Sequence, residues 1–314
     1  MSSSVSSTGR SGLVHLVGAG ILWGTGGLLG TLLHRATGLS PVAVATCRLA
    51  VGGLLLVALL VSTRRPWPRD PLAWRRIGAV SVLAAVFQAA YFAAVTTSSV
   101  SLATLITIGM SPVLVAALEH STGRRAVDRL RAVTIGIALC GLALLVGVPT
   151  GDAGAGGLLA GAVLASTAAA AFATVTVINA TPVPGLDAMT TTGLGFTGGA
   201  VLLAPLAAAG GVAFDPTPNS VALVLLLGLA PTAVAYTLYF RGLAAAGPGL
   251  AAVLALLEPL TGAVLAAVFL GERLTAPGLA GAALLVLAVL LAARPARPAA
   301  PAQDTAAGRC SSRD

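Results

Sequence analysis

The chain has 314 residues, of which 57% are hydrophobic and only 9% are charged, with 18 basic side chains against 10 acidic ones. A soluble domain usually carries about 25% charged residues, so this composition cannot cover a surface that faces water. It excludes a soluble enzyme, a disordered protein and a nucleic-acid-binding protein. The sequence therefore predicts an integral membrane protein, although its net charge is +8.

Long apolar runs recur along the whole chain, and a membrane-spanning helix needs about 20 mostly apolar residues. The first run is too long for the apolar part of a signal peptide, and no small-residue cleavage site ends it, so we interpret it as the first span. Short connections rich in proline and glycine separate several runs and make neighbouring spans antiparallel. The ten predicted spans are 13–33, 41–62, 76–95, 100–118, 130–148, 156–178, 187–209, 219–240, 249–270 and 276–293.

The second half of the chain repeats the first. Residues 99–112 read SVSLATLITIGMSP, residues 247–259 read GPGLAAVLALLEP, and a Tyr-Phe pair precedes each segment. Each copy holds five spans, and because five is odd the second copy must enter the membrane inverted, as in many transporters. We therefore expect an all-α membrane protein with these parts: an N-terminal tail at 1–12, a first repeat at 13–148, a second repeat at 156–293, and a disordered tail at 294–314.

All basic residues are arginine, and their distribution predicts the orientation. If the N-terminus is cytoplasmic, only Arg35 and Arg273 lie in outer segments, and Arg48 lies within a span. Arginine is enriched on the cytoplasmic side of membrane proteins, so we expect both termini in the cytoplasm and the protein in the plasma (inner) membrane. The inner arginines are then Arg10, Arg64, Arg65, Arg69, Arg75, Arg76, Arg124, Arg125, Arg129, Arg131, Arg241, Arg294, Arg297, Arg309 and Arg313.

Glu258 is the most informative residue of the sequence. It lies about ten residues into the ninth predicted span, at a depth of about 15 Å, which is the middle of a hydrocarbon core about 30 Å thick. A carboxylate at that depth must face a cavity, be protonated or be paired. Pro259 removes a backbone donor beside it and loosens the helix. We interpret Glu258 as a group that binds substrate or protons; an acid that only bridges helices is the alternative.

Arg48 is the only basic residue predicted to be buried within a span rather than at its end, about 10 Å below the outer boundary. It could meet Glu258 directly or through a bound substrate, or its long side chain could extend to the outer interface. Other polar and aromatic side chains within the spans are expected to shape a cavity, although hydrogen bonding between helices is the alternative for each of them. These candidates are Trp23, Gln88, Tyr91, Thr104, Thr107, Ser111, Tyr236 and Tyr239, with helix breaks at Pro112 and Pro259.

No cofactor or metal site is predicted. The three cysteines are scattered and the three histidines lie near the ends of spans, so neither a disulfide framework nor a metal site is expected. A G-x-G-x-x-G string lies inside the seventh span with no strand before it, which excludes nucleotide binding. Glycines at four-residue spacing, such as Gly20 with Gly24 and Gly26 with Gly30, predict closely packed helices instead.

Several segments resemble the EamA domain of the drug/metabolite transporter superfamily. The resemblance covers about residues 13–293 as two copies, and the first copy departs from the pattern because Ser111-Pro112 stands where Glu-Pro is usual. The segments that carry the resemblance are LEPL at 257–260, LGERL at 270–274, LWGT at 22–25, Arg48, and AYTLYFR at 235–241.

The resemblance implies a ten-helix bundle whose central cavity opens alternately to each side. It also implies secondary transport of small metabolites, often amino acids or their derivatives, and often export. We therefore expect a metabolite exporter rather than an enzyme, with a small polar molecule and the lipid bilayer as partners, and with Glu258 as a proton-linked or substrate-sensing acid. A lipid-carrier flippase with a lateral groove and a non-transporting membrane scaffold are the alternatives that stay open.

Overall fold

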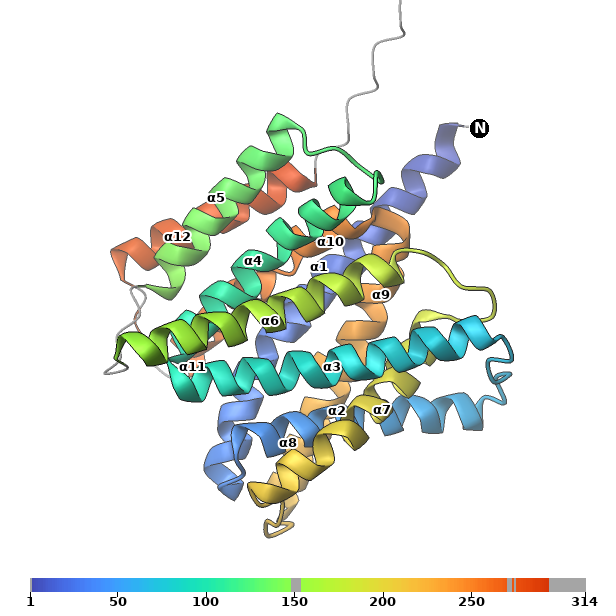
Figure 1. Cartoon of the computed structure of the whole chain (residues 1–314), viewed down its shortest axis with the longest axis vertical. Coiled ribbons are helices and arrows are strands. Elements are labelled where there is room, and N and C mark those ends of the chain that lie inside the picture. The colour runs from blue at the N-terminus through green and yellow to red at the C-terminus, as the bar shows by residue number, and fades with distance from the viewer. Residues whose placement is uncertain (1, 148–153, 270–272, 274, 294–314) are drawn as a thin grey trace, which may run out of the picture.

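The computed structural model describes residues 2–147, 154–269, 273 and 275–293, with side chains from residue 11 onward, and these residues form a bundle of helices (Figure 1). The tail predicted at 294–314 and most of the LGERL segment at 270–274 lie outside the described residues. The helices are α1 (Ser2–Thr37), α2 (Pro41–Ser62), α3 (Pro71–Thr97), α4 (Val100–Ser121), α5 (Arg129–Val146), α6 (Ala155–Asn179), α7 (Ala188–Ala209), α8 (Pro218–Gly228), η1 (Leu229–Val234), α9 (Ala235–Ala246), α10 (Pro248–Leu254), α11 (Leu257–Phe269) and α12 (Ala276–Ala292).

Within the described residues, nine helical stretches are long and apolar enough to cross a membrane, and the shorter apolar helix Ala276–Ala292 supplies the tenth predicted span. The eighth span consists of α8, the π-helix η1 and α9, and the ninth consists of α10 and α11. The prediction of an all-α membrane fold is confirmed. The first helix differs in length, because α1 begins at Ser2 and runs through the segment predicted as an N-terminal tail.

Local capping chemistry explains where several spans begin. Ser40 precedes Pro41 and accepts a hydrogen bond from a backbone N–H of the first turn of α2, and Asp70 does the same before Pro71. A small polar cap followed by proline is the usual start of a helix, because the cap satisfies a free N–H and proline needs none there. The second span therefore begins where the sequence predicted, whereas the third begins earlier than residue 76.

The contacts between helices repeat when the two halves are exchanged. The second span α2 packs on the seventh, α7, and the fifth span α5 packs on the tenth, α12 (Figure 1). Contact of the third span with the sixth, α3 with α6, is matched by contact of the eighth with the first, α9 with α1. Contact of α4 with α6 is likewise matched by contact of α11 with α1. This exchange is what two related five-helix halves around a pseudo-twofold axis produce.

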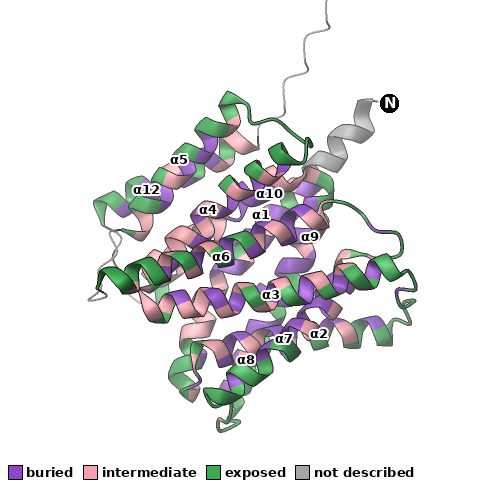
Figure 2. Cartoon of the chain, viewed as in Figure 1, coloured by how far each residue is buried: buried purple, intermediate pink, exposed green. Residues whose placement is uncertain are grey.

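The outer faces of the helices are apolar and exposed, as a surface that contacts lipid must be. Val14, Leu159 and Val201 are 69%, 69% and 67% exposed, and the buried residues lie where helices face one another (Figure 2). Glycine allows the closest approaches between helices. A Cβ added at Gly52 of α2 would lie 2.7 Å from the carbonyl oxygen of Gly228 in α8, so both backbones meet with no side chain between them.

Candidate functional site

A cavity of about 560 Å³ lies at the centre of the bundle. Its lining comes from α1, α2, α3, α4, α6, α8, α9 and the start of α11. It reaches His34, Pro41 and Val100 at the ends of α1, α2 and α4, which lie at the end of the bundle that is poor in arginine. The predicted residues that line it are Trp23, Arg48, Gln88, Tyr91, Thr104, Thr107, Ser111, Tyr236, Glu258 and Pro259. We call it the outer cavity.

Glu258 stands directly after a break in the ninth span. Helix α10 ends at Leu254, two residues in turn conformation follow, and α11 begins at Leu257. Because Pro259 has no N–H, the carbonyl of Ala255 cannot receive the usual bond from four residues ahead. It accepts one from the backbone N–H of Glu258 instead, at 3.0 Å. The helix is therefore interrupted beside this acid, and Glu258, only partly buried, lines the outer cavity.

Arg48 is held at the cavity by the π-helix of the eighth span. Its Nε donates to Oγ1 of Thr232 over 3.4 Å, and the same hydroxyl donates to the carbonyl of Leu227 over 2.9 Å. The described ion pairs join other residues, so Arg48 and Glu258 share the cavity without a direct salt bridge. Arg48 lines the cavity. Sequence reasoning missed Thr232, although a threonine after Pro231 in mid-span was a usable signal.

Replacing Thr232 by valine is expected to destabilise the fold by about 1–3 kcal/mol. The isosteric change keeps the packing of this fully buried side chain but leaves the Leu227 carbonyl without its partner. A double-mutant cycle with Arg48→Met, measured by denaturant unfolding, isolates the contribution of the Arg48–Thr232 contact. We expect an interaction free energy between the two substitutions of at least about 0.5 kcal/mol. Strictly additive effects would contradict the contact, and Thr232→Ser is the control that keeps the hydroxyl.

Hydrogen bonds tie the polar face of α4 to its neighbours. Thr104 and Tyr91 of α3 share a bond of 2.9 Å between their hydroxyls, and Thr107 donates to the carbonyl of Ala165 in α6. Ser111 donates to the carbonyl of Thr107 one turn earlier. Thr104, Thr107 and Ser111 all line the cavity, and their hydroxyl groups also bond within α4 or to neighbouring helices. Pro112 lies inside α4, which continues through it to Ser121.

A cluster of rings forms the floor of the outer cavity. Trp23 of α1 lies with its ring centroid 4.8 Å from those of both Tyr236 and Tyr239 of α9, and Phe172 of α6 lies 5.7 Å from Tyr239. Tyr239 is 1% exposed, bonds to Thr176 at 2.8 Å, and lies behind Trp23 rather than in the cavity lining. Phe240 follows at 5.9 Å from Tyr239. We call these five residues the aromatic barrier.

The glycines of α1 serve two different purposes. A Cβ at Gly20 would lie 2.8 Å from the carbonyl oxygen of Leu254, so this glycine lets α1 pack on the break in the ninth span. A Cβ added at Gly24 would likewise lie 2.9 Å from the carbonyl oxygen of Glu258. Gly26 and Gly30, which the sequence predicted as packing positions, both line the outer cavity. A Cβ at Gly26 would also lie 3.4 Å from the Cβ of Pro231, whereas the nearest atom to a Cβ at Gly30 would be 3.9 Å away.

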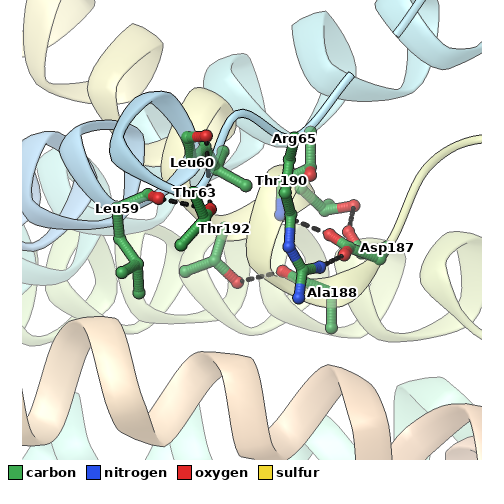
Figure 3. Close-up of polar contacts among 9 residues, drawn as sticks. Leu59, Leu60, Thr63, Arg65, Asp187, Ala188, Thr190 and Thr192 are labelled. Atoms are coloured by element: carbon green, nitrogen blue, oxygen red, sulfur yellow. Dashed lines mark hydrogen bonds and ion pairs between the residues drawn. The ribbon is translucent and has the colours of Figure 1, made fainter. Parts of the chain in front are cut away.

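Ion pairs gather at the opposite, arginine-rich end of the bundle. Arg65, just after α2, lies 2.5 Å from the carboxylate of Asp187 at the start of α7 (Figure 3). Arg131 of α5 pairs with Glu119 near the end of α4, and both side chains are largely buried. A Cβ added at Gly249 in α10 would lie 2.8 Å from Nη2 of Arg131, so this second pair packs directly against the other half of the molecule.

Asp187 is expected to make stability fall in acid. Partial burial raises the pKa of its carboxyl, but hydrogen bonds from Thr190 and the Arg65 guanidinium outweigh burial and set the pKa below its ordinary value. The ionised group therefore stabilises the fold above the ordinary carboxyl range, and this contribution is lost as pH falls through the lowered pKa. Thermal unfolding of Asp187→Asn should show a weaker acid decline at that pH. Asp187→Ala should be less stable at all pH values, because the helix cap is also lost. An unchanged pH profile in Asp187→Asn would contradict this.

The arrangement defines a class of protein before any comparison is made. Helices long enough to span a membrane, contacts that repeat between the two halves, and a central cavity that carries an acid and an arginine are the features of a multi-pass membrane transporter. Among the described residues, no group of three histidine, cysteine, aspartate or glutamate side chains could hold a metal ion.

Comparison with known proteins gives the family. The model of the EamA-like transporter family matches residues 10–147 and again residues 159–294. YwfM of Bacillus subtilis (strain 168), described as an uncharacterized transporter, is 29% identical over 277 residues, which cover 87% of this chain and 90% of YwfM. YicL of Salmonella typhimurium (strain LT2), described as an uncharacterized inner membrane transporter, is 25% identical over 294 residues, 90% of this chain and 95% of YicL.

The chain belongs to the EamA-like transporter family. It is a multi-pass membrane transporter and not an enzyme, as the sequence predicted. A protein of known crystal structure agrees in fold, with a TM-score of 0.74 at 18% identity over 91% of this chain and 98% of that one.

Proposed function

We propose that the chain is a secondary transporter of the plasma (inner) membrane that exports a small polar metabolite, such as an amino acid or its derivative, by alternating access. One observation carries the proposal: Arg48 and Glu258 carry opposite charges, face the same cavity of about 560 Å³, and do not pair with each other. Cavities of about 300–1,000 Å³ suit small-molecule ligands. Two separated charges suit a ligand that itself carries a cation and an anion.

A third group in the cavity supports a polar ligand. The indole N–H of Trp23 is buried and has no hydrogen-bond acceptor among the described residues, although its ring packs in the aromatic barrier. A buried donor without a partner costs about 1–3 kcal/mol, and a ligand that reached this N–H after a turn of the ring would remove that cost. Arg48 and Glu258 offer an amino-acid-like molecule one cation and one anion directly, and Trp23 lies beside them in the cavity lining.

Proton coupling through Glu258 is part of the proposal. A carboxylate near the middle of the membrane is costly unless it is paired, hydrated or protonated, so protonation and substrate binding at Glu258 compete or cooperate. The break between α10 and α11 supports this assignment, because interrupted helices at mid-membrane are where secondary transporters bind substrates and coupling ions.

The orientation follows from the arginines. With both termini in the cytoplasm, the outer cavity opens to the outside and the aromatic barrier closes it toward the cytoplasm. The inner-membrane description of YicL, a relative, supports the same location. Export rather than import rests on the resemblance to the family.

A metabolite panel tests the proposed function. The protein purified in detergent is heated with each of the amino acids and their derivatives, and a true ligand raises the unfolding midpoint by mass action. The ligand found this way is then loaded into proteoliposomes with and without a pH gradient. We expect one chemical class to stabilise the wild type and to be transported faster with the gradient. A lipid-carrier flippase or a scaffold would show no stabilisation by any soluble metabolite, which would contradict the proposal.

A further inference from the structure

A second cavity, of about 340 Å³, lies at the arginine-rich end of the bundle. Its lining comes from α1, α3, the end of α6, the connection to α7, the start of α7 and α9. Phe240 of the aromatic barrier lines this cavity, whereas Trp23, Phe172 and Tyr236 of the same barrier line the outer one. The two cavities therefore lie on opposite sides of the barrier. We call the second one the inner cavity.

Basic side chains dominate the lining of the inner cavity. His15, Arg76 and Arg241 line it, and Asp187 is the only acid that does so among the described residues. The carboxylate of Asp187 is already engaged, because it accepts bonds from Arg65 and from the backbone N–H of Thr190. Arg241 makes no hydrogen bond and no ion pair with any described residue. The balance of unpaired charge in the inner cavity is therefore positive.

The carbonyl end of α6 does not cancel this positive charge. Nη1 of Arg76 donates to the carbonyls of Ile178 and Thr181, and Arg124 donates to the carbonyl of Val177 at 3.1 Å. These bonds satisfy the partial negative charge that the last turn of a helix exposes. In the described bonds Arg76 uses only Nη1, so its other N–H groups stay available for a ligand.

The inner cavity is also related to the mouth of the outer cavity by exchange of the two repeated halves of the molecule. The outer mouth is formed by the end of α1, the start of α2 and the end of α3. Exchange of the two halves turns these parts into the end of α6, the start of α7 and the end of the eighth span, α9, which all line the inner cavity. Phe92, in the outer cavity, and Phe240, in the inner one, belong to the two Tyr-Phe pairs of the sequence repeat. The mouth of the outer cavity thus has a basic counterpart on the other side of the barrier.

We propose that the inner cavity binds an oxyanion of the phosphate type, with Arg241 as its unpaired cation and the remaining N–H groups of Arg76 as further donors. The planar guanidinium group of arginine donates paired hydrogen bonds to phosphate oxygens, and two such groups balance the negative charge of a phosphate. A free phosphate compound and the headgroup of an anionic phospholipid present the same chemistry. The proposal concerns binding alone, so its test does not depend on the direction or the substrate of transport.

Inorganic phosphate in detergent tests the free-anion source. The unfolding midpoint of the full chain is measured against phosphate concentration, with sodium chloride at matched ionic strength as the reference. We expect phosphate to raise the midpoint of the wild type beyond the chloride reference. Arg241→Gln should weaken the apparent affinity about tenfold, as the loss of one charge-assisted hydrogen bond implies.

Two further variants keep the test specific. Arg35→Gln makes the same charge change at the exposed, opposite end of the bundle, and we expect it to respond to phosphate as the wild type does. Ala244→Phe fills the inner cavity without changing its charge, and we expect it to lose the phosphate response while it still unfolds cooperatively.

Nanodiscs test the lipid source. The midpoint in nanodiscs of phosphatidylcholine is compared with that in nanodiscs containing phosphatidylglycerol, for the wild type, Arg241→Gln and Arg35→Gln. A rise with phosphatidylglycerol that Arg241→Gln lacks and Arg35→Gln retains identifies a headgroup as the oxyanion and supports the proposal. The proposal is overturned if neither phosphate nor phosphatidylglycerol stabilises the wild type. It is also overturned if Arg241→Gln responds as the wild type does, or if Arg35→Gln loses the response equally.

Discussion

Replacing Glu258 by glutamine is expected to lower metabolite flux into proteoliposomes by about 10- to 100-fold, which corresponds to the loss of a hydrogen bond to a charged group, about 1.5–3 kcal/mol. The amide has nearly the same shape, so the break between α10 and α11 and the lining of the outer cavity stay in place. It carries no charge and exchanges no proton. The flux that remains should therefore no longer respond to a pH gradient.

Asp215→Asn is the matched control, because it removes one acidic charge from an exposed position in the connection between α7 and α8. We expect this variant to transport at the wild-type rate and to keep its response to the gradient. If Glu258→Gln folds normally and transports as fast as the wild type with an intact response, Glu258 is a structural acid and the proposed coupling is wrong.

Replacing Gly20 by alanine is expected to lower the free energy of unfolding, even though alanine favours a helix by about 1 kcal/mol over glycine. The added Cβ would lie 2.8 Å from the carbonyl oxygen of Leu254 and 2.8 Å from the Cβ of Leu257. Neither atom belongs to a flexible end, so α1 and the ninth span must move apart, and overpacking of this kind costs about 1–3 kcal/mol. Because this contact holds the break beside Glu258, flux should fall together with stability.

Gly27→Ala is the control for Gly20→Ala. Gly27 lies in the same helix and nothing lies within 4 Å of a Cβ built there. Unfolding of the two variants in the same detergent is compared with the wild type, and Gly27→Ala should be at least as stable as the wild type. Equal stability of Gly20→Ala and Gly27→Ala would show that the contact between α1 and the ninth span does not constrain the fold.

The fold was largely predictable because the strongest signals in this sequence are physical necessities of a bilayer. Apolar runs of span length, the scarcity of charge and the repeated segments at 99–112 and 247–259 led to a prediction of ten spans in two related halves. Within the described residues, nine helical stretches are long enough to span a membrane, and Ala276–Ala292 is a shorter apolar helix. Glu258 and Arg48 could be singled out because a charge inside a span is costly wherever it occurs. Their shared cavity follows from the packing of α2 and α11 around it.

Other parts of the site could not be predicted because they depend on packing between distant segments. The π-helix η1 places Thr232 against Arg48, and although Pro231 marks an irregular point in the span, the sequence does not indicate which distant residue Thr232 contacts. Phe172 and Phe240 look like any apolar residues of a span, and only the fold brings them into the aromatic barrier. The inner cavity joins Arg76 and Arg241, which the sequence indicated only as markers of orientation.

Accessibility of a cysteine at Gly27 tests most directly whether the cavity with Glu258 and Arg48 is the transport pathway. Gly27 lines the outer cavity with open space around it, and the variant is made in a chain without Cys47, Cys140 and Cys310. Intact cells are treated with a membrane-impermeant maleimide. Val163→Cys is the control, because Val163 is 59% exposed on the surface of α6 that faces lipid. The account predicts labelling at Gly27→Cys, slowed by the transported metabolite, and none at Val163→Cys. Absence of labelling from outside, or labelling that the metabolite leaves unchanged, would contradict it.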